Sequence, residues 1–321
     1  MKLATFRPGG GAPRIGAVHD GDRKLLDLTE AADGDTRFSS MLALIDGGEA
    51  ALAKARDLLT ANAANTALNH AIAEIELLSP LPEPRQMRDG MSYETHIRQS
   101  GRGMRHLMSG GDMSSVGEQD LPPLGAVYSQ LPIYYITNRM IVRGPETTVV
   151  WPRYSTVMDY ELEYGIVIGK TGANISEADA RDHIFGYTIF NDFSARDQQG
   201  REMPGWLGPA KGKSFDGGNV LGPWIVTRDD IPDPYSLRAS VRVNGETRCE
   251  STTAGMLFSF EKILAHMSQD ETIFAGEFIG SGTIGNGCGL ETGLFLEDGD
   301  VIELDIEKIG VLRNRVVRQA S

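Results

Sequence analysis

Hydrophobic and polar positions alternate most regularly from Tyr160 to Ile168, where the chain reads Tyr-Glu-Leu-Glu-Tyr-Gly-Ile-Val-Ile. Successive side chains of a β-strand point to opposite faces, so the first, third, fifth, seventh and ninth residues share one apolar face. The opposite face carries Glu161 and Glu163. The pattern therefore predicts a strand that directs two carboxylates to the same side.

The start of the chain alternates short apolar runs with turn residues, which predicts small strands and tight turns. An alanine-rich stretch, from about Ser40 to Ala71, predicts a helix. Three prolines then fall within residues 78–84, and proline disrupts both helices and central strands. We therefore expect a domain boundary there, with a small N-terminal α+β domain over residues 1–80 and a larger domain over residues 85–321.

Beyond the prolines, a helix is expected from Ser92 to Met108, with Ser92 as its N-cap. Residues 109–125 are rich in Gly, Ser, Asp and Pro, and we expect a mobile loop that serves as a lid. Later segments read mostly as strands, with helices expected at 176–184 and 259–268. Strands dominate without regular strand–helix alternation, which predicts an α+β fold with a β-rich antiparallel or mixed sheet rather than a doubly wound parallel one.

Charge and composition narrow the range of partners. The chain has 321 residues and a net charge of −13, which repels phosphate backbones and anionic lipids, so neither nucleic acid nor a membrane is an expected partner. The first residues turn polar too early for a signal peptide, and no apolar run approaches membrane-spanning length, which predicts a cytoplasmic protein. The two cysteines, Cys249 and Cys288, are expected to be free thiols.

Taken alone, Glu161 and Glu163 are more typical of a solvated sheet face than of a metal site. Two neighbouring carboxylates nevertheless repel each other unless a cation or protons intervene. A second feature changes the interpretation, because a strand predicted over 186–192 runs into the polar cluster Asn191-Asp-Phe-Ser-Ala-Arg-Asp-Gln-Gln199. Such clusters are usually loop surface, yet they are also where a rigid scaffold positions catalytic groups.

Four segments together resemble the fumarylacetoacetate hydrolase (FAH) family. They are Asp89-Gly-Met-Ser-Tyr-Glu-Thr-His96, Asp159–Glu163, Asn191–Gln199 and Gly208-Pro-Ala-Lys-Gly-Lys-Ser-Phe215. The resemblance implies an FAH-type β-roll catalytic domain, a homodimer, and one divalent metal ion held by Asp89, Glu161, Glu163 and Asp192. An all-oxygen ligand set favours a hard cation, so Mg²⁺ is expected first, with Mn²⁺ or Ca²⁺ as alternatives.

The same resemblance implies a proton-transfer pair. His96 would activate water, and Glu291 would orient its imidazole and stabilise the charged form. In some other members the partner acid lies three residues after the histidine, where this chain has Gln99. Glu291 is therefore the expected partner.

Further roles follow from the resemblance. The residues expected to stabilise an oxyanion are Lys213, Arg196 and Gln199, with surface salt bridging as the alternative. The expected substrate contacts are Arg105, Tyr135 and Thr283, and the guanidinium of Arg105 would grip a carboxylate. Where the prototypes have a tyrosine shortly after the Gln199 position, this chain has Met203.

A glycine-rich run at 280–285 fits the dinucleotide-binding pattern Gly-x-Gly-x-x-Gly, but no amphipathic helix pattern follows it, so we interpret it as a turn. The predicted function is a metal-dependent hydrolase that cleaves a carbon–carbon bond of a fumarylacetoacetate- or acylpyruvate-like diketo acid. The alternatives are a lyase on the same fold, such as an oxaloacetate decarboxylase or a 2-oxo-4-enoate hydratase, and a noncatalytic binding relative. The expected partner of the enzyme is a small diketo or 2-oxo acid substrate.

Overall fold

The computed structural model describes residues 1–319. Its largest element is an 11-stranded sheet made of β1 (Lys2–Arg7), β2 (Arg14–His19), β3 (Lys24–Asp27), β4 (Asn69–Ala71), β5 (Glu76–Leu77), β6 (Met87–Gly90), β7 (Tyr134–Ile136), β10 (Leu162–Ile168), β11 (Ile184–Asp192), β13 (Asn219–Thr227) and β16 (Phe278–Gly280). The strands lie in the order β4-β3-β2-β1-β13-β11-β10-β16-β6-β7, and β5 pairs with β1. Sheet hydrogen bonding thus runs from the N-terminal strands into the rest of the molecule.

A second sheet of five strands comprises β8 (Thr148–Trp151), β14 (Arg238–Val243), β15 (Glu246–Thr252), β17 (Val301–Ile306) and β18 (Gly310–Arg318). Their order is β15-β14-β17-β18-β8, and a small pair joins β9 (Met158–Asp159) to β12 (Ser194–Ala195). The β16–β6 and β18–β8 pairs are parallel, whereas the other pairs are antiparallel. The predicted class, α+β with a mixed β-rich sheet, is confirmed.

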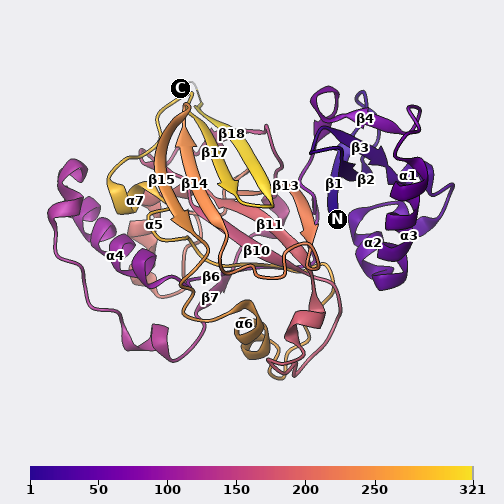
Figure 1. Cartoon of the computed structure of the whole chain (residues 1–321). Coiled ribbons are helices and arrows are strands. Elements are labelled where there is room, and N and C mark those ends of the chain that lie inside the picture. The colour runs from indigo at the N-terminus through magenta and orange to yellow at the C-terminus, as the bar shows by residue number, and fades with distance from the viewer. Residues whose placement is uncertain (320–321) are drawn as a thin grey trace.

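Short helices surround the sheets. They are α1 (Leu28–Ala31), α2 (Met41–Asp46), α3 (Gly48–Asn62), α4 (Glu94–Met108), α5 (Arg196–Glu202), α6 (Phe260–Met267) and α7 (Gly289–Thr292), with 3₁₀ turns η1 (Thr36–Phe38), η2 (Ile72–Glu74), η3 (Met113–Glu118), η4 (Ala126–Ser129), η5 (Arg139–Ile141), η6 (Ala180–His183) and η7 (Met203–Gly205). Figure 1 shows α1, α2 and α3 beside β1–β4 at one side of the molecule, and α4 at the opposite side. Among the described residues, no helix is long and apolar enough to cross a membrane.

The central strand β10 is buried on both faces, whereas its alternation of apolar and polar residues alone is more typical of a strand with one solvated face. Its residues Leu162 and Tyr164 belong to the core between the two sheets, while Val167 on the other face packs into the core beneath the N-terminal helices. Glu163 lies on this second face and is buried as well. Glu163 therefore does not lie on a solvated face of the sheet.

Three helix predictions need correction. The helix expected at 176–184 is wrong, because only η6 forms; the Ser176 hydroxyl bonds both the amide and the carboxylate of Asp179 and closes a local turn instead. The alanine-rich helix breaks at Gly47 and ends at Asn62, and its predicted last residues form β4. Tyr93 occupies the N-cap position of α4 without a side-chain hydrogen bond, so the expected Ser92 cap is also wrong.

Other local predictions are confirmed. The early small strands are β1, β2 and β3, and the helix expected at 259–268 is α6, whose N-cap hydroxyl from Ser259 accepts from the Lys262 amide. Both cysteines are free and buried. The stretch 109–125 contains η3, which packs against α4 and α7. Its role as a lid stays a prediction, and so does the division into two domains at residues 78–84.

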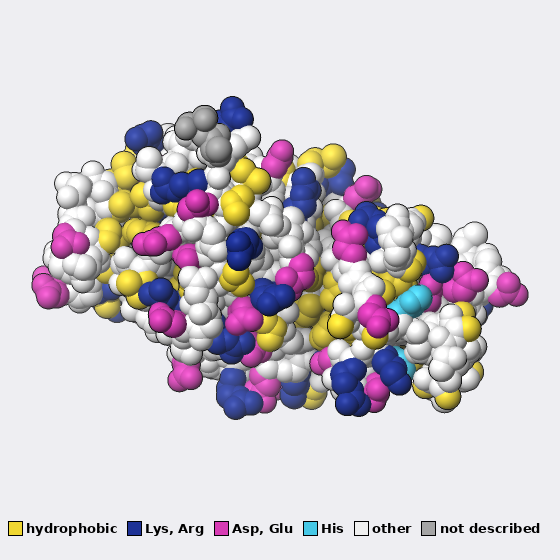
Figure 2. Space-filling model, turned by 90° about the horizontal axis from the view of Figure 1, so that it is seen from above, with side chains coloured by type: hydrophobic (Ala, Val, Ile, Leu, Met, Phe, Trp, Pro, Cys, Tyr) yellow, Lys and Arg dark blue, Asp and Glu magenta, His cyan; other side chains and the backbone are white. Residues whose placement is uncertain are grey.

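The face shown in Figure 2 carries basic and acidic side chains side by side rather than in a patch of one sign.

Candidate active site

Three carboxylates come together from the neighbouring strands β10 and β11 and from β6, which β16 separates from β10. Asp89 lies on β6, Glu163 on β10 and Asp192 at the end of β11, and each offers an oxygen within 4.8 Å of the others. All three side chains are buried. Because they come from strands far apart in sequence, the sheet itself builds the cluster.

These carboxylates lack the partners that buried oxygens normally have. Asp89 Oδ1, Glu163 Oε2 and Asp192 Oδ1 accept no hydrogen bond. Burial and the charge of Asp192 raise the pKa of Asp89 to about 8, and burial raises the pKa of Asp192 to about 6 despite the nearby Lys213. Burial and Asp89 also raise the pKa of Glu163 well above its usual range. A divalent cation would satisfy all three oxygens and relieve the repulsion.

The backbone leaves space for such an ion beside these oxygens. Gly280 on β16 pairs with both Gly165 and Asp89, and a Cβ added there would lie 2.4 Å from Asp89 Oδ1 and 3.2 Å from Glu163 Oε2. Any side chain at this position would crowd the two carboxylates. The donor set, its unpartnered oxygens and this cradle all fit a hard divalent metal ion.

Glu161 behaves differently from the other predicted metal ligands. Its carboxylate forms ion pairs with Lys213 Nζ at 2.5 Å and with Arg196 Nη2 at 2.8 Å. Although burial favours the neutral acid, these cations lower the pKa of Glu161. The structure therefore gathers three of the four predicted ligands and holds the fourth against two cations. The metal role of all four stays a prediction.

Lys213 lies between the carboxylate cluster and Glu161. Its ammonium group also donates to Asp192 Oδ2 at 2.6 Å and to the Asp192 carbonyl at 3.2 Å. Burial alone would favour the neutral amine, but the charges of Asp192 and Glu161 outweigh it and raise the pKa of Lys213. Lys213 is thus a buried, permanently charged group at the edge of the cluster.

Asp159 is a positioning residue to which the sequence analysis assigned no role. Its carboxylate accepts from Arg196 Nε at 2.8 Å and from the backbone amides of Gly289 and Leu290 at 2.7 and 2.9 Å. It therefore fixes both the guanidinium and the start of α7, which carries Glu291. The only sequence signal was its place at the head of the Asp-Tyr-Glu-x-Glu run, which gives no hint of its partners.

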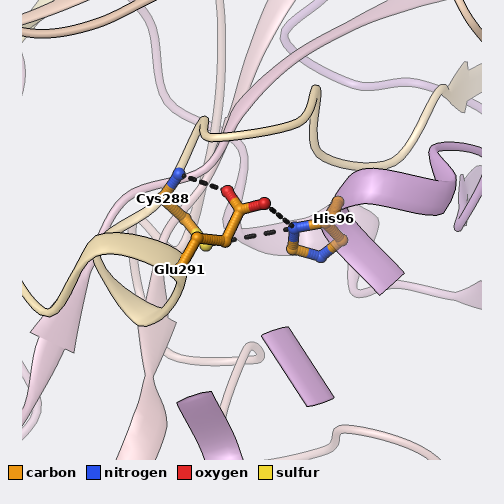
Figure 3. Close-up of side chains that lie close together, drawn as sticks. All are labelled: His96, Cys288 and Glu291. Carbon is orange, nitrogen blue, oxygen red and sulfur yellow. Dashed lines mark hydrogen bonds and ion pairs between the residues drawn. The ribbon is translucent and has the colours of Figure 1, made fainter. Parts of the chain in front are cut away.

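His96 and Glu291 come together from α4 and α7. His96 Nδ1 lies 3.4 Å from Glu291 Oε1, and Figure 3 shows the carboxylate directed at the imidazole. The Glu291 oxygens also accept from the backbone amides of Asn286 and Cys288, each at 3.0 Å. Cys288 Sγ lies 4.0 Å from His96 Nδ1, but burial and Glu291 raise the pKa of this thiol, which makes it a poor metal ligand. The pair is therefore suited to proton transfer.

The remaining predicted residues divide into two groups. Tyr135 donates to Asp192 Oδ2 at 2.9 Å, Thr283 donates to Glu163 Oε1 at 3.2 Å, and Gln199 accepts from Arg196 Nη1 at 2.9 Å. These three contact the site's own charged groups. Arg105, by contrast, is exposed on α4 and does not line the cavity, so the structure gives no support to its predicted grip on a carboxylate.

A cavity of about 410 Å³ unites the carboxylate cluster, Lys213 and the His96 side chain. Met203 and Pro209 line it from either end of the short segment that follows α5. The tip of this segment holds Trp206 and Leu207, whose side chains are 93% and 98% exposed. Two large apolar side chains thus stand in solvent beside the cavity mouth.

A statistical model of the Fumarylacetoacetate (FAA) hydrolase C-terminal domain matches residues 86–317. The chain belongs to the fumarylacetoacetate hydrolase family. The matched region includes every candidate site residue named above. The family membership predicted from the four sequence segments is thereby confirmed.

Relatives within this family align along nearly the whole chain. Oxaloacetate tautomerase YisK of Bacillus subtilis (strain 168) is 32% identical over 313 residues, covering 94% of this chain and 95% of that protein. The human mitochondrial oxaloacetate tautomerase FAHD2A is 32% identical, covering 99% of this chain and 92% of its own length. A solved fumarylacetoacetate hydrolase from Exiguobacterium antarcticum superposes with a TM-score of 0.74 at 28% identity, over 99% of this chain and 100% of that one. The FAH fold thus extends over the N-terminal residues as well.

Proposed function

We propose that this FAH-family protein is a divalent-metal-dependent enzyme that interconverts the keto and enol forms of a 2-oxo acid. The observation that carries the proposal is that one cavity brings together a carboxylate cluster and the His96–Glu291 pair. Binding a 2-oxo acid and moving a proton on the adjacent carbon require these two groups. The names of the relatives, oxaloacetate tautomerases, make oxaloacetate the first substrate to test.

Asp89, Glu163 and Asp192 would hold the metal ion, and Glu161 would join them if Lys213 released it. Oxygen ligands favour Mg²⁺, with Mn²⁺ or Ca²⁺ as alternatives. The bound ion would supply positive charge that stabilises the negative charge developing on the 2-oxo oxygen.

The chain's own groups perform the remaining tasks. His96 presents its Nδ1 to Glu291, which leaves Nε2 to take a proton from the substrate carbon and deliver it to the 2-oxo oxygen, and to carry it back when the enol becomes the keto form. Glu291 stabilises the imidazolium while His96 holds that proton. Asp159 holds Arg196 and the start of α7 in place, so the acid does not drift from the histidine. Burial of these groups excludes water and strengthens each charge interaction.

A second candidate function is hydrolysis of a carbon–carbon bond in a fumarylacetoacetate- or acylpyruvate-like diketo acid. The His96–Glu291 pair favours it, because the same arrangement can activate water. Decarboxylation of oxaloacetate uses the same cavity and differs in releasing carbon dioxide. Product identity separates the three reactions.

The test combines substrate and variant. Purified protein with Mg²⁺ is mixed with the enol form of oxaloacetate, and the loss of enol absorbance is followed against the uncatalysed rate. We expect at least hundredfold slower turnover in His96→Ala and Glu163→Gln, with thermal stabilisation by Mg²⁺ lost only in Glu163→Gln. His266→Ala on α6 is the matched control. Full turnover in His96→Ala would rule out the proposed proton transfer.

If neither enol loss nor product release occurs while Mg²⁺ still stabilises the protein, the noncatalytic binding alternative takes over. The cluster of Asp89, Glu163 and Asp192 argues against that outcome, because a protein without activity would not need to keep all three carboxylates. The homodimer also stays a prediction, which light scattering on the purified protein will test.

A further inference from the structure

The charges that line the cavity restrict the substrate. Among the described residues, the only lysine and arginine in its wall are Lys213 and Arg196. Each already lies between two carboxylates: Lys213 pairs with Glu161 and Asp192, and Arg196 with Glu161 and Asp159. A metal ion held by Asp89, Glu163 and Asp192 would account for the charge of one substrate carboxylate. A second carboxylate at the far end of the substrate would have no cation of its own.

The chemistry of the wall changes along α4. His96, Ser100 and Met104 follow one another at four-residue spacing and all line the cavity. Residues four apart share a helix face, and eight residues span about 12 Å along the axis. The wall therefore passes from the proton-transfer group, through one hydroxyl, to a thioether.

The cavity also has apolar walls. Among its lining side chains are Ile97, Met104, Tyr128, Ile133, Met203 and Leu290. These side chains come from α4, α7, η7 and the segment around 128–133. An apolar chamber of this kind favours burial of hydrocarbon and penalises an unpaired charge.

Met104 lies in close packing between α4 and α5. Gly200 on α5 lies so near α4 that an added Cβ would be 2.8 Å from Met104 Sδ and 2.3 Å from Met108 Sδ. Met203 follows at the end of α5 and faces the cavity. Methionine is unbranched and polarisable, so such a wall adapts to apolar groups of differing shape.

We infer that the part of the cavity lined by Met104 and Met203 is a subsite for an uncharged hydrocarbon or aromatic tail, and that these two methionines set this specificity. The inference rests on the proposed function, because the 2-oxo acid head is what places the tail there. It narrows that function, because it predicts that a 2-oxo acid with an apolar tail is a better substrate for this chain than a dicarboxylate such as oxaloacetate. The preferred substrate is a 2-oxo acid whose third carbon bears an apolar chain.

The test is a binding series on the Mg²⁺-loaded protein. Calorimetry would compare the straight-chain acids from pyruvate to 2-oxooctanoate with the dicarboxylates oxaloacetate and 2-oxoglutarate. We expect affinity to rise about fourfold per added methylene, equivalent to about 0.8 kcal/mol, until the subsite is full. A dicarboxylate should bind at least about tenfold more weakly than the monoacid of equal length.

Variants test whether the side chains of Met104 and Met203 cause the dependence of affinity on chain length. Met104→Ala should reduce the gain from longer chains while leaving pyruvate binding unchanged, and Met203→Arg should reverse the preference toward dicarboxylates. Met203→Leu should restore the wild-type pattern, and Met140→Ala, at a residue 73% exposed, is the control. Retained pyruvate binding shows that each variant is folded.

The outcomes separate the two proposals. A chain-length gain in affinity, with no turnover of the enol form of either oxaloacetate or the tightest-binding acid of the series, keeps the subsite and rejects the tautomerase function. Enol turnover with an affinity that does not depend on chain length, or with 2-oxoglutarate bound more tightly than 2-oxopentanoate, rejects the subsite and keeps the function. Failure to bind any member of the series rejects the subsite.

Discussion

Gly280 shows how one missing side chain creates the space for a metal ion. An alanine there would bring its Cβ to 2.4 Å from Asp89 Oδ1, closer than real Cβ contacts come, so the carboxylate must move. We predict that Gly280→Ala lowers Mg²⁺ affinity at least about tenfold, since ligand geometry is what Mg²⁺ demands. Calorimetric titration measures it. Gly117→Ala, where an added Cβ meets nothing within 4 Å, is the control and should bind Mg²⁺ normally.

The raised acid pKa values give the metal-free protein a defined pH dependence. Asp89 and Asp192 titrate at about 8 and about 6 when folded and at about 4 when unfolded, so the folded state holds more protons between these values. The free energy of unfolding should therefore fall as pH rises from about 4 to about 8. Urea unfolding of metal-free protein across this range tests it. A free energy of unfolding that rises with pH would contradict the assignment.

Mg²⁺ must displace the same protons. Its apparent affinity should therefore rise by up to about tenfold per pH unit for each proton released. Titrations in buffers of different ionisation enthalpy count the protons directly. Release of no protons at pH 6 would show that the carboxylates are already ionised.

The sequence motifs point to residues that the structure brings close together, but they do not reveal the partners of those residues. Asp89, Glu163 and Asp192 could be found because their motifs are local and their strands are regular. The ion pairs of Glu161 could not, because Lys213 and Arg196 reach it only after β10, β11 and the loop before β13 have packed. Asp159 was overlooked for the same reason, as its amide partners lie at Gly289 and Leu290, far along the chain.

At the scale of elements, the proton-transfer pair depends on how closely α4 approaches α7. Gly103 allows this approach, because a Cβ there would lie 1.9 Å from the Leu290 carbonyl oxygen. We predict that Gly103→Ala pushes the helices apart, separates His96 from Glu291 and lowers kcat at least about tenfold while Mg²⁺ affinity is kept. Steady-state kinetics with a parallel Mg²⁺ titration measure both effects.

Gly101→Ala is the matched control on the same helix, because its added Cβ would be 3.8 Å from the nearest atom, an ordinary contact. It should stabilise α4 by up to about 1 kcal/mol. Unchanged kcat in Gly103→Ala would mean that the pair tolerates a looser contact than its 3.4 Å separation suggests.

The helix predictions were wrong where polar side chains form hydrogen bonds with backbone groups that a helix would otherwise use. At 176–184 the Ser176 hydroxyl captures the Asp179 amide and carboxylate, and His183 Nδ1 bonds the Lys170 carbonyl, so the segment folds as a turn tied to its neighbours. Near residue 62, Asn side chains bond preceding carbonyls and end the alanine-rich helix. The regular pattern at 259–268, with a serine cap, had no such competitor and was predicted correctly.

At the scale of the whole molecule, the 11-stranded sheet crosses the proline-rich stretch that the sequence suggested as a domain boundary. β1 pairs with β13 through Lys2↔Val226 and Leu3↔Ile225, so backbone hydrogen bonds join residues before and after the prolines. We predict that the full chain unfolds in one cooperative transition by calorimetry. Two separate heat-absorption peaks would instead support independent domains.

The exposed tip of the segment after α5 has an optical consequence. The chain has three tryptophans, and two of them, Trp151 and Trp224, are buried, whereas Trp206 stands in solvent beside Met203 at the cavity mouth. Its fluorescence emission should therefore differ from theirs in wavelength and in quenching by iodide. Trp206 is therefore an intrinsic fluorophore at the cavity mouth, and stopped-flow fluorescence can follow ligand binding there without an added label.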